Sequence, residues 1–185
     1  WIASTFDNSY DNLGRKGSYI YYGERWAHVG AAPHSFHKTV ISQGGINVPL
    51  ILSYGRELPK NKVVREFSSI VDITPTLLDL VGVSHPGTEF LGRKVHTIDG
   101  RSMLPFLKGQ QETIYPAGTG GGFELFGHNA FISGNWKLLR LQEPYGDFSW
   151  GLYDLDADPA ELDDLAQQNP EKLQELIGLY TEYAA

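Results

Sequence analysis

Lys38 has the clearest chemical setting in the sequence, because it opens the stretch KTVISQGGINVP at residues 38–49. A β-branched run follows the lysine, and then come the glycine pair Gly44–Gly45 and the apolar segment 46–52. Glycine lets a backbone turn sharply or approach another surface closely, and so apolar a segment is typical of a strand buried on both faces. The pattern predicts a cationic side chain that a rigid scaffold holds beside a binding site. The alternative is an ordinary surface lysine, because most lysines are exposed charges.

Three histidines near this stretch, His28, His34 and His37, are candidates for metal binding, since imidazole is a common metal ligand. Their side chains would have to share one face of a helix. Pro33 and the polar residues around it argue against a stable helix here. We therefore expect these histidines to pack or to face solvent.

The carboxylates do not form a recognisable metal site either. Asp7 and Asn8 offer hard oxygens to calcium, but two adjacent residues are too few ligands. Aspartates alternate over residues 154–158 as at the start of a calcium loop, yet Pro159 stands where the loop glycine belongs and Leu165 where the bidentate glutamate belongs. A serine nucleophile would need a GxSxG elbow, which is missing, and the chain has no cysteine. These residues alone predict neither a nucleophile nor a metal site.

The composition is that of an ordinary globular protein, with 41% hydrophobic and 20% charged residues over 185 positions. The net charge is −7 and lysines and arginines do not cluster, so we expect no nucleic-acid partner. No apolar run approaches the roughly 20 residues of a membrane span, and we expect a soluble chain. Trp1 is not a start residue, which indicates a fragment of a longer protein.

The first half of the chain predicts part of an α/β domain, over residues 1–109. Turn formers and aromatic residues mix in residues 1–32, where Tyr19, Tyr21, Tyr22 and Trp26 could line a pocket or, as we expect, pack as a lid against the core. Strands are expected at residues 48–53 and 63–69. A helix follows in VDITPTLLDLVGV, capped by Asp72 or Thr74 and stopped at Gly82.

The second half, residues 110–185, predicts a small α+β subdomain. The glycine run at residues 118–122 lacks the lysine of a phosphate-binding loop and is expected to be a flexible connector. Strands at 130–133 and 136–141 flank the hairpin turn Gly134–Asn135, and a third strand is expected at 150–154. The last helix should begin after Asn169 with Pro170 in its first turn and lie across this antiparallel sheet.

Several ordered segments together resemble the C-terminal third of a type I sulfatase, with the greatest similarity to bacterial arylsulfatases. The segments are the Lys38 stretch, VDITPTLLDLVGV, DGRSMLPFLKG, NWKLLRL and LYDLDADPAELDDLA. The resemblance implies the C-terminal part of an alkaline-phosphatase-like fold, α/β and then α+β, ending in a small antiparallel sheet packed by a C-terminal helix. It leaves the compartment unknown, with the bacterial cytoplasm and periplasm both possible.

The resemblance also implies an activity, the hydrolysis of sulfate esters, with aryl sulfates as the expected substrate class. Such enzymes use a formylglycine, made from the cysteine or serine of a CxPxR or SxPxR motif, beside a calcium ion. Neither motif is present here, so the nucleophile and the metal ligands are expected in the missing N-terminal part, and the fragment alone is expected to be inactive. Lys38 matches the family's second sulfate-binding lysine. Asp7 and Asn8 are followed by Ser9 and not by the usual glycine, so no metal is assigned to them; Asn47 replaces the arginine of a related GGIRVP pattern.

Two other functions remain open at this point. The same scaffold could hydrolyse a phosphate or phosphonate ester, because superfamily folds host several chemistries. A noncatalytic module is the other possibility, in which the aromatic residues of the first segment stack on a carbohydrate.

Overall fold

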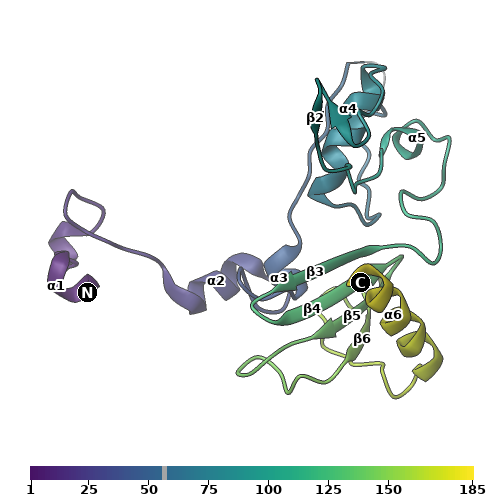
Figure 1. The fold of residues 1–185 in the computed structure, drawn as a ribbon. Coiled ribbons are helices and arrows are strands. Elements are labelled where there is room, and N and C mark those ends of the chain that lie inside the picture. The colour runs from purple at the N-terminus through teal and green to yellow at the C-terminus, as the bar shows by residue number, and fades with distance from the viewer. Residues whose placement is uncertain (56–57) are drawn as a thin grey trace.

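The computed structural model describes residues 1–55 and 58–185 and consists of short helices followed by an antiparallel sheet and a long final helix (Figure 1). In chain order the described elements are α1 (Ile2–Thr5), η1 (Tyr10–Asn12), α2 (Gly23–Ala31), α3 (Gln43–Ile46), η2 (Ile70–Asp72), α4 (Ile73–Leu80), β1 (Glu89–Phe90), β2 (Arg93–Lys94), α5 (Leu104–Leu107), β3 (Gly121–Leu125), β4 (His128–Ser133), β5 (Trp136–Arg140), β6 (Gly151–Asp154) and α6 (Pro170–Tyr183).

The sheet has the order β3–β4–β5–β6, and every neighbouring pair is antiparallel. The predicted hairpin turn is confirmed, because Ser133 pairs with Trp136 across Gly134 and Asn135. Gly134 has a φ of 59°, a left-handed conformation that glycine adopts without strain. The third predicted strand is confirmed as β6, which pairs with β5 from Leu139–Gly151 to Trp136–Asp154.

Helix α6 covers one face of the sheet, as predicted (Figure 1). Pro170 occupies its first turn, where the missing N–H costs nothing. Leu176 and Tyr180 are buried against Phe131, Leu138 and Leu152 of strands β4, β5 and β6. Each such side chain contributes about 1.5–3 kcal/mol by leaving water. Burial, helped by a hydrogen bond to Glu124, raises the pKa of Tyr180 to about 12.

The opposite face of the sheet packs against the Lys38 stretch. Ala130, Leu139 and Leu141 form a buried cluster there with Val40 and Ile41. Side chains alternate between the two faces of a strand, so neighbouring residues of β4 and β5 serve the two different cores. The sheet therefore lies between α6 and the segment that follows Lys38.

Two predicted strands are wrong in this chain. Residues 48–53 and 63–69 contain no strand, and Val48 and Ile51 are 76% and 89% exposed and not buried on both faces. A strand needs a neighbour for its ladder of hydrogen bonds, and no described residue pairs with either segment.

Three shorter segments also differ from the expectation. The double glycine lies in the short helix α3 and not in an open turn. Residues 1–32 include α1, η1 and the nine-residue α2. The glycine run was expected to be a flexible connector, but Gly121 and Gly122 begin β3 and pack against the rings of Phe67 and Tyr183. Only glycine leaves space for rings at those positions.

The predicted helix after residue 72 is confirmed as α4, and Gly82 has the left-handed φ of 68° expected beyond its end. Asp72 is fully buried and accepts hydrogen bonds from the N–H of Ser69, the N–H of Arg101 and the hydroxyl of Tyr115. One carboxylate thereby ties the start of α4 to the loop before α5. This unit, with the β1–β2 hairpin, stands above the sheet in Figure 1.

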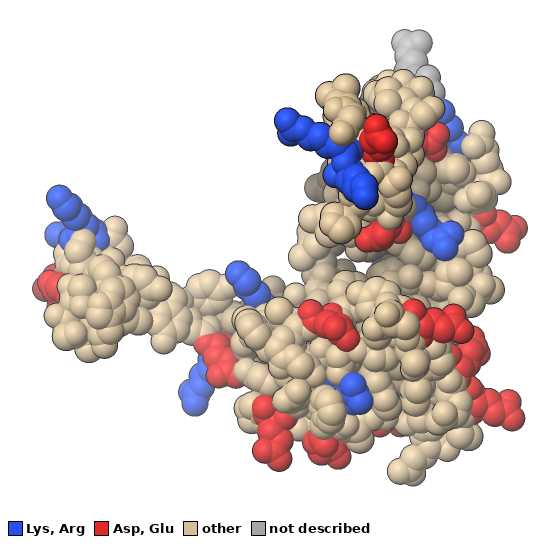
Figure 2. All heavy atoms as spheres, viewed as in Figure 1, with Lys and Arg blue, Asp and Glu red and all other residues tan. Residues whose placement is uncertain are grey.

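The N-terminal segment, which contains α1, extends away from the rest of the chain (Figure 1). On the face shown in Figure 2, acidic side chains are spread over the sheet and α6, whereas lysines and arginines are more frequent on the other parts. Among the described residues, no helix is long and apolar enough to cross a bilayer. The division of the chain at residue 109 stays a prediction.

Candidate functional site

Lys38 lies in the turn between α2 and α3 and is exposed. Its ammonium group makes no hydrogen bond or ion pair with any residue that the structure describes. The backbone on both sides of it is unusual, because Phe36 and Thr39 have φ values of 58° and 88°. Positive φ is strained for a β-branched residue such as Thr39, and such strain persists only where the surroundings enforce it.

The residues that follow Lys38 provide that enforcement. Val40, Ile41 and Ser42 are 1%, 2% and 0% exposed. The Ser42 hydroxyl donates to the carbonyl of Ser35 at 2.7 Å, and the Gly44 N–H donates to the same oxygen at 3.0 Å. Lys38 is therefore an exposed side chain on a turn whose backbone is fixed by buried neighbours, and its place beside a binding site stays a prediction.

The glycine pair is required by close backbone approach. A Cβ on Gly45 would lie 1.6 Å from the carbonyl oxygen of Val40, and one on Gly44 would lie 2.3 Å from those of Ser35 and Phe36. Neither glycine has a positive φ, so space and not backbone conformation excludes a side chain here. The prediction that these glycines serve close approach is confirmed.

We expect Gly45→Ala to destabilise the protein by about 3 kcal/mol, because the methyl group can fit only if the Lys38 turn shifts. Gly178→Ala is the matched control, since a Cβ there meets nothing within 4 Å on the helix α6. It should stabilise the protein by about 0.5–1 kcal/mol. Urea unfolding of both variants measures the two effects, and equal midpoints would contradict the close approach at Gly45.

A buried ion pair between Lys137 and Glu161 fixes the backbone just after Lys38. Lys137 on β5 is 0% exposed, and its Nζ donates to the carbonyl of Ile41 at 2.8 Å and contacts Glu161 Oε1 at 2.5 Å. The other oxygen of Glu161 accepts the N–H of Gln43 at 2.7 Å. Burial lowers the pKa of Lys137, and the adjacent Glu161 carboxylate opposes that shift. Two charges from β5 and the loop after β6 thus fix two backbone groups just beyond Lys38.

The loop at 158–161 makes further contacts with the same turn. The Ser35 hydroxyl donates to the carbonyl of Ala160, and His34 Nδ1 donates to that of Pro159 at 2.7 Å. Asn47 lies 3.3 Å from the other ring nitrogen of His34. The residue in place of the related pattern's arginine therefore helps to hold the turn.

The alternating aspartates at residues 154–158 brace the backbone. Asp158 accepts the N–H groups of Leu162 and Asp163, and Asp154 accepts the side chain of Asn135 and the N–H of Asp156. Carboxylates that accept several local N–H groups are typical of turns and helix starts. In this stretch, Glu161 is the carboxylate that fixes the turn after Lys38, and sequence reasoning did not single it out.

Glu24, His28 and His37 come together, contrary to expectation. Glu24 and His28 lie on α2, which ends before Pro33, so the proline does not prevent the helix. One ligand atom from each of the three residues lies within 4.8 Å of the others. His34 is not part of this group, because its ring faces Pro159. The signal available in the sequence was the spacing of Glu24 and His28, which are four residues apart and share a helix face.

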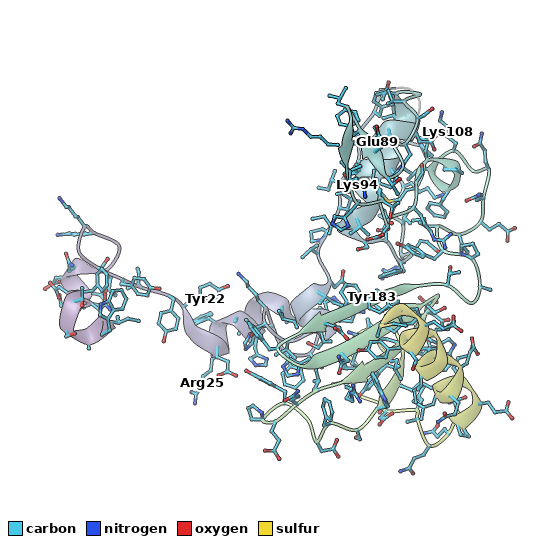
Figure 3. All side chains as sticks on the ribbon, viewed as in Figure 1. Tyr22, Arg25, Glu89, Lys94, Lys108 and Tyr183 are labelled. Carbon is cyan, nitrogen blue, oxygen red and sulfur yellow. The ribbon has the colours of Figure 1, made fainter. Side chains whose placement is uncertain are left out.

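The aromatic residues of the first segment do not form a lid against the core. Tyr21, Tyr22 and Trp26 are 75%, 71% and 65% exposed. Figure 3 shows Tyr22 at the start of α2, where the chain leaves the N-terminal segment. Asn8 makes two hydrogen bonds with the backbone of Tyr19, and Asp7 accepts the N–H of Ser9. The polar pair therefore braces a loop.

Comparison with known proteins identifies the family. The family model for the C-terminal region of N-sulphoglucosamine sulphohydrolase matches residues 33–178. An uncharacterised sulfatase of Schizosaccharomyces pombe is 38% identical over 97% of the chain, and an arylsulfatase of Klebsiella aerogenes is 43% identical over 42% of it. The chain spans 32% and 17% of the length of these two relatives.

A solved structure confirms the fold. The crystal structure of Ps i-CgsB in complex with k-i-k-neocarrahexaose has a TM-score of 0.66 and 20% sequence identity, and the match covers 82% of this chain and 32% of that one. Together with the sheet and α6, this likeness agrees with the C-terminal part of a sulfatase fold. The chain belongs to the sulfatase family and corresponds to the C-terminal region of its members.

Proposed function

We propose that the chain is part of a longer enzyme that hydrolyses sulfate esters, with aryl sulfates as the substrate class, and that Lys38 binds a sulfate oxygen. One observation carries this proposal: Lys38 is exposed, whereas the residues that follow it are buried. Hydrogen bonds from Lys137 and to Glu161 hold the backbone of those residues in place. The family match supports the reaction class.

The role of Lys38 follows from the charge of the reacting group. When the S–O bond of a sulfate ester breaks, negative charge grows on the leaving oxygen and on the other sulfuryl oxygens. A positive charge that is already in place stabilises this charge without reorganisation. An aryl oxide is a stable anion, so an alkyl sulfate depends more strongly on the lysine.

The nucleophile and the cation come from elsewhere in the proposed enzyme. The formylglycine and calcium that the resemblance implies would supply a nucleophilic oxygen and a Lewis acid. The described residues do not fit those groups, because the sequence lacks the CxPxR and SxPxR motifs and Asp7 and Asn8 are engaged by backbone N–H groups. Lys38 is thus this chain's contribution to the reaction.

The exposed extended segments fit the same proposal. Residues 48–54 include Val48, Ile51 and Tyr54, which are 76%, 89% and 46% exposed, and Val63 in the next extended segment is 84% exposed. Apolar side chains exposed over such contiguous segments are costly in water. We propose that the missing N-terminal part pairs with them and buries them.

The test compares the 185-residue chain with a longer protein that contains it, using 4-nitrophenyl sulfate. Turnover should be found in the longer protein only, and calorimetry should find no stoichiometric calcium binding by the chain alone. Turnover by the chain itself, or none by the longer protein with any sulfate ester, would contradict the proposal. Faster turnover of 4-nitrophenyl phosphate would instead favour the phosphate ester alternative.

A carbohydrate-binding role is a second candidate, favoured by the exposed rings of Tyr21, Tyr22 and Trp26. Sugar rings stack on such exposed aromatic faces. Titration with sulfated oligosaccharides, followed by tryptophan fluorescence, tests this role, and Trp26→Ala should abolish the change. A response that survives this substitution would exclude stacking on Trp26.

A further inference from the structure

Glu24, His28 and His37 bring three potential metal ligands, one carboxylate and two imidazoles, together from two segments of the chain. Glu24 and His28 lie one helical turn apart on α2, and His37 lies in the turn immediately before Lys38. His37 Nε2 is 3.7 Å from Glu24 Oε1, and the rings of His28 and His37 have centroids 4.7 Å apart at an interplanar angle of 87°. The three ligand atoms all lie within 4.8 Å of one another.

The hydrogen bond of His37 determines which nitrogen is available. Its Nδ1 lies 2.9 Å from the carbonyl oxygen of Lys38, and because a carbonyl can only accept, Nδ1 must carry the proton. Nε2 of the neutral ring therefore keeps its lone pair and points toward Glu24. A backbone carbonyl that orients the imidazole in this way is typical of histidines that ligate metals.

The lone pair of His37 Nε2 is also unsatisfied. The atom is buried, and no described residue hydrogen-bonds to it. Leaving a buried acceptor without a partner costs about 1–3 kcal/mol. Glu24 cannot satisfy the lone pair of a neutral ring, because a carboxylate is itself an acceptor. A cation between the two groups would satisfy both.

We propose that Glu24, His28 and His37 bind a zinc-type divalent cation. Two imidazoles and one carboxylate are a donor set that zinc accepts, whereas calcium prefers oxygen ligands alone. Ligands of a tetrahedral zinc ion lie about 3.3–3.4 Å apart, given metal–ligand distances of about 2.0–2.1 Å. Closing a spacing of up to 4.8 Å requires shifts of up to about 1.4 Å, to which the Glu24 side chain can contribute because it is 63% exposed.

The cation would connect α2 to the turn that carries Lys38. Three protein ligands leave a fourth position for water or an anion. The Lys38 carbonyl holds the liganding ring of His37, so metal binding and the backbone at Lys38 are linked. This inference stands on the three side chains and does not require the proposed sulfate ester hydrolysis.

The test is calorimetric titration of the metal-free 185-residue chain with zinc. One zinc ion per chain should bind, excess calcium should not displace it, and cobalt should give the strong visible absorption of a four-coordinate ion. His28→Gln, His37→Gln and Glu24→Gln should each weaken zinc binding by about 10-fold or more. His96→Gln, at an exposed histidine outside the group, should leave it unchanged.

Two results would overturn the proposal. One is the absence of zinc binding by the chain when circular dichroism shows native secondary structure. The other is zinc binding that survives Glu24→Gln and His28→Gln, or that His96→Gln weakens as much. Both α2 variants lie on an exposed helix face, so they decide the question even if His37→Gln disturbs the turn. Sulfatase activity is not a readout, so the result is independent of the proposed function.

Discussion

Lys137→Met is expected to destabilise the protein by about 3–5 kcal/mol, because it leaves the carboxylate of Glu161 buried without its counter-charge. Lys137 is 0% exposed and the Glu161 side chain is 1% exposed, so water cannot take over the role of the ammonium. The carbonyl of Ile41 also loses its donor. Urea or thermal unfolding followed by circular dichroism measures the loss.

A surface ion pair offers the matched control. Lys172 and Glu175 lie 2.6 Å apart, nearly as close as the buried pair at 2.5 Å, but their side chains are 34% and 47% exposed. Lys172→Met should change the stability by less than about 1 kcal/mol, because water screens an exposed pair. If the two methionine variants unfolded at the same denaturant concentration, Lys137 would not have the structural role described here.

The double variant Lys137→Met, Glu161→Gln separates charge from packing. Removing both charges relieves the unpaired carboxylate, so the double variant should be more stable than Lys137→Met alone. A residual cost should remain, since Ile41 still lacks its donor. A double variant that is less stable than Lys137→Met would show that burying the Glu161 carboxylate without its counter-charge does not destabilise the protein.

The second large effect concerns Lys38 in a longer protein that contains this chain. Lys38→Ala should lower kcat/KM for an aryl sulfate by about 10²- to 10³-fold, the effect of losing one preorganised donor. The loss should be larger for an alkyl sulfate, whose leaving oxygen carries more charge. Steady-state kinetics with both substrates provide the measurement, and unchanged turnover of the aryl sulfate would exclude the assignment.

Stability distinguishes this effect from misfolding. Lys38 is exposed and has no partner among the described residues, so Lys38→Ala should unfold at the same temperature as the parent. Lys94→Ala serves as a control for loss of surface charge, because Lys94 is an exposed lysine on β2, in the unit above the sheet (Figure 3). Its kcat/KM should not change. Equal losses in both variants would indicate a general electrostatic effect.

Local patterns predicted the elements that are stabilised locally. The Gly134–Asn135 turn, the helix α4 with Gly82 beyond it, and the start of α6 at Pro170 all depend on residues within a few positions of one another. Backbone conformation and capping act at that range, which is why a single sequence suffices. The glycine pair was also predicted to permit close approach, and the distances at Gly44 and Gly45 confirm this.

Patterns whose meaning depends on distant partners were interpreted less well. The apolar segment after Gly45 predicted a buried strand, but burial requires neighbouring strands that the described residues do not provide. The histidines were treated as separate because Pro33 suggested broken structure, whereas α2 ends before it. Periodicity indicates which residues are apolar or share a face, and it does not indicate what covers that face.

By itself the sequence determined the family resemblance, the order of elements in the C-terminal half and the choice of Lys38 as the candidate anion ligand. Only the tertiary structure decided how that lysine is held. Lys137 and Glu161 are far from it along the chain and resemble ordinary surface charges in the sequence, yet packing of the sheet against residues 40–43 buries them both. Burial and pairing are properties of three-dimensional neighbours, and so are the approach of His37 to α2 and the cation site that we infer there.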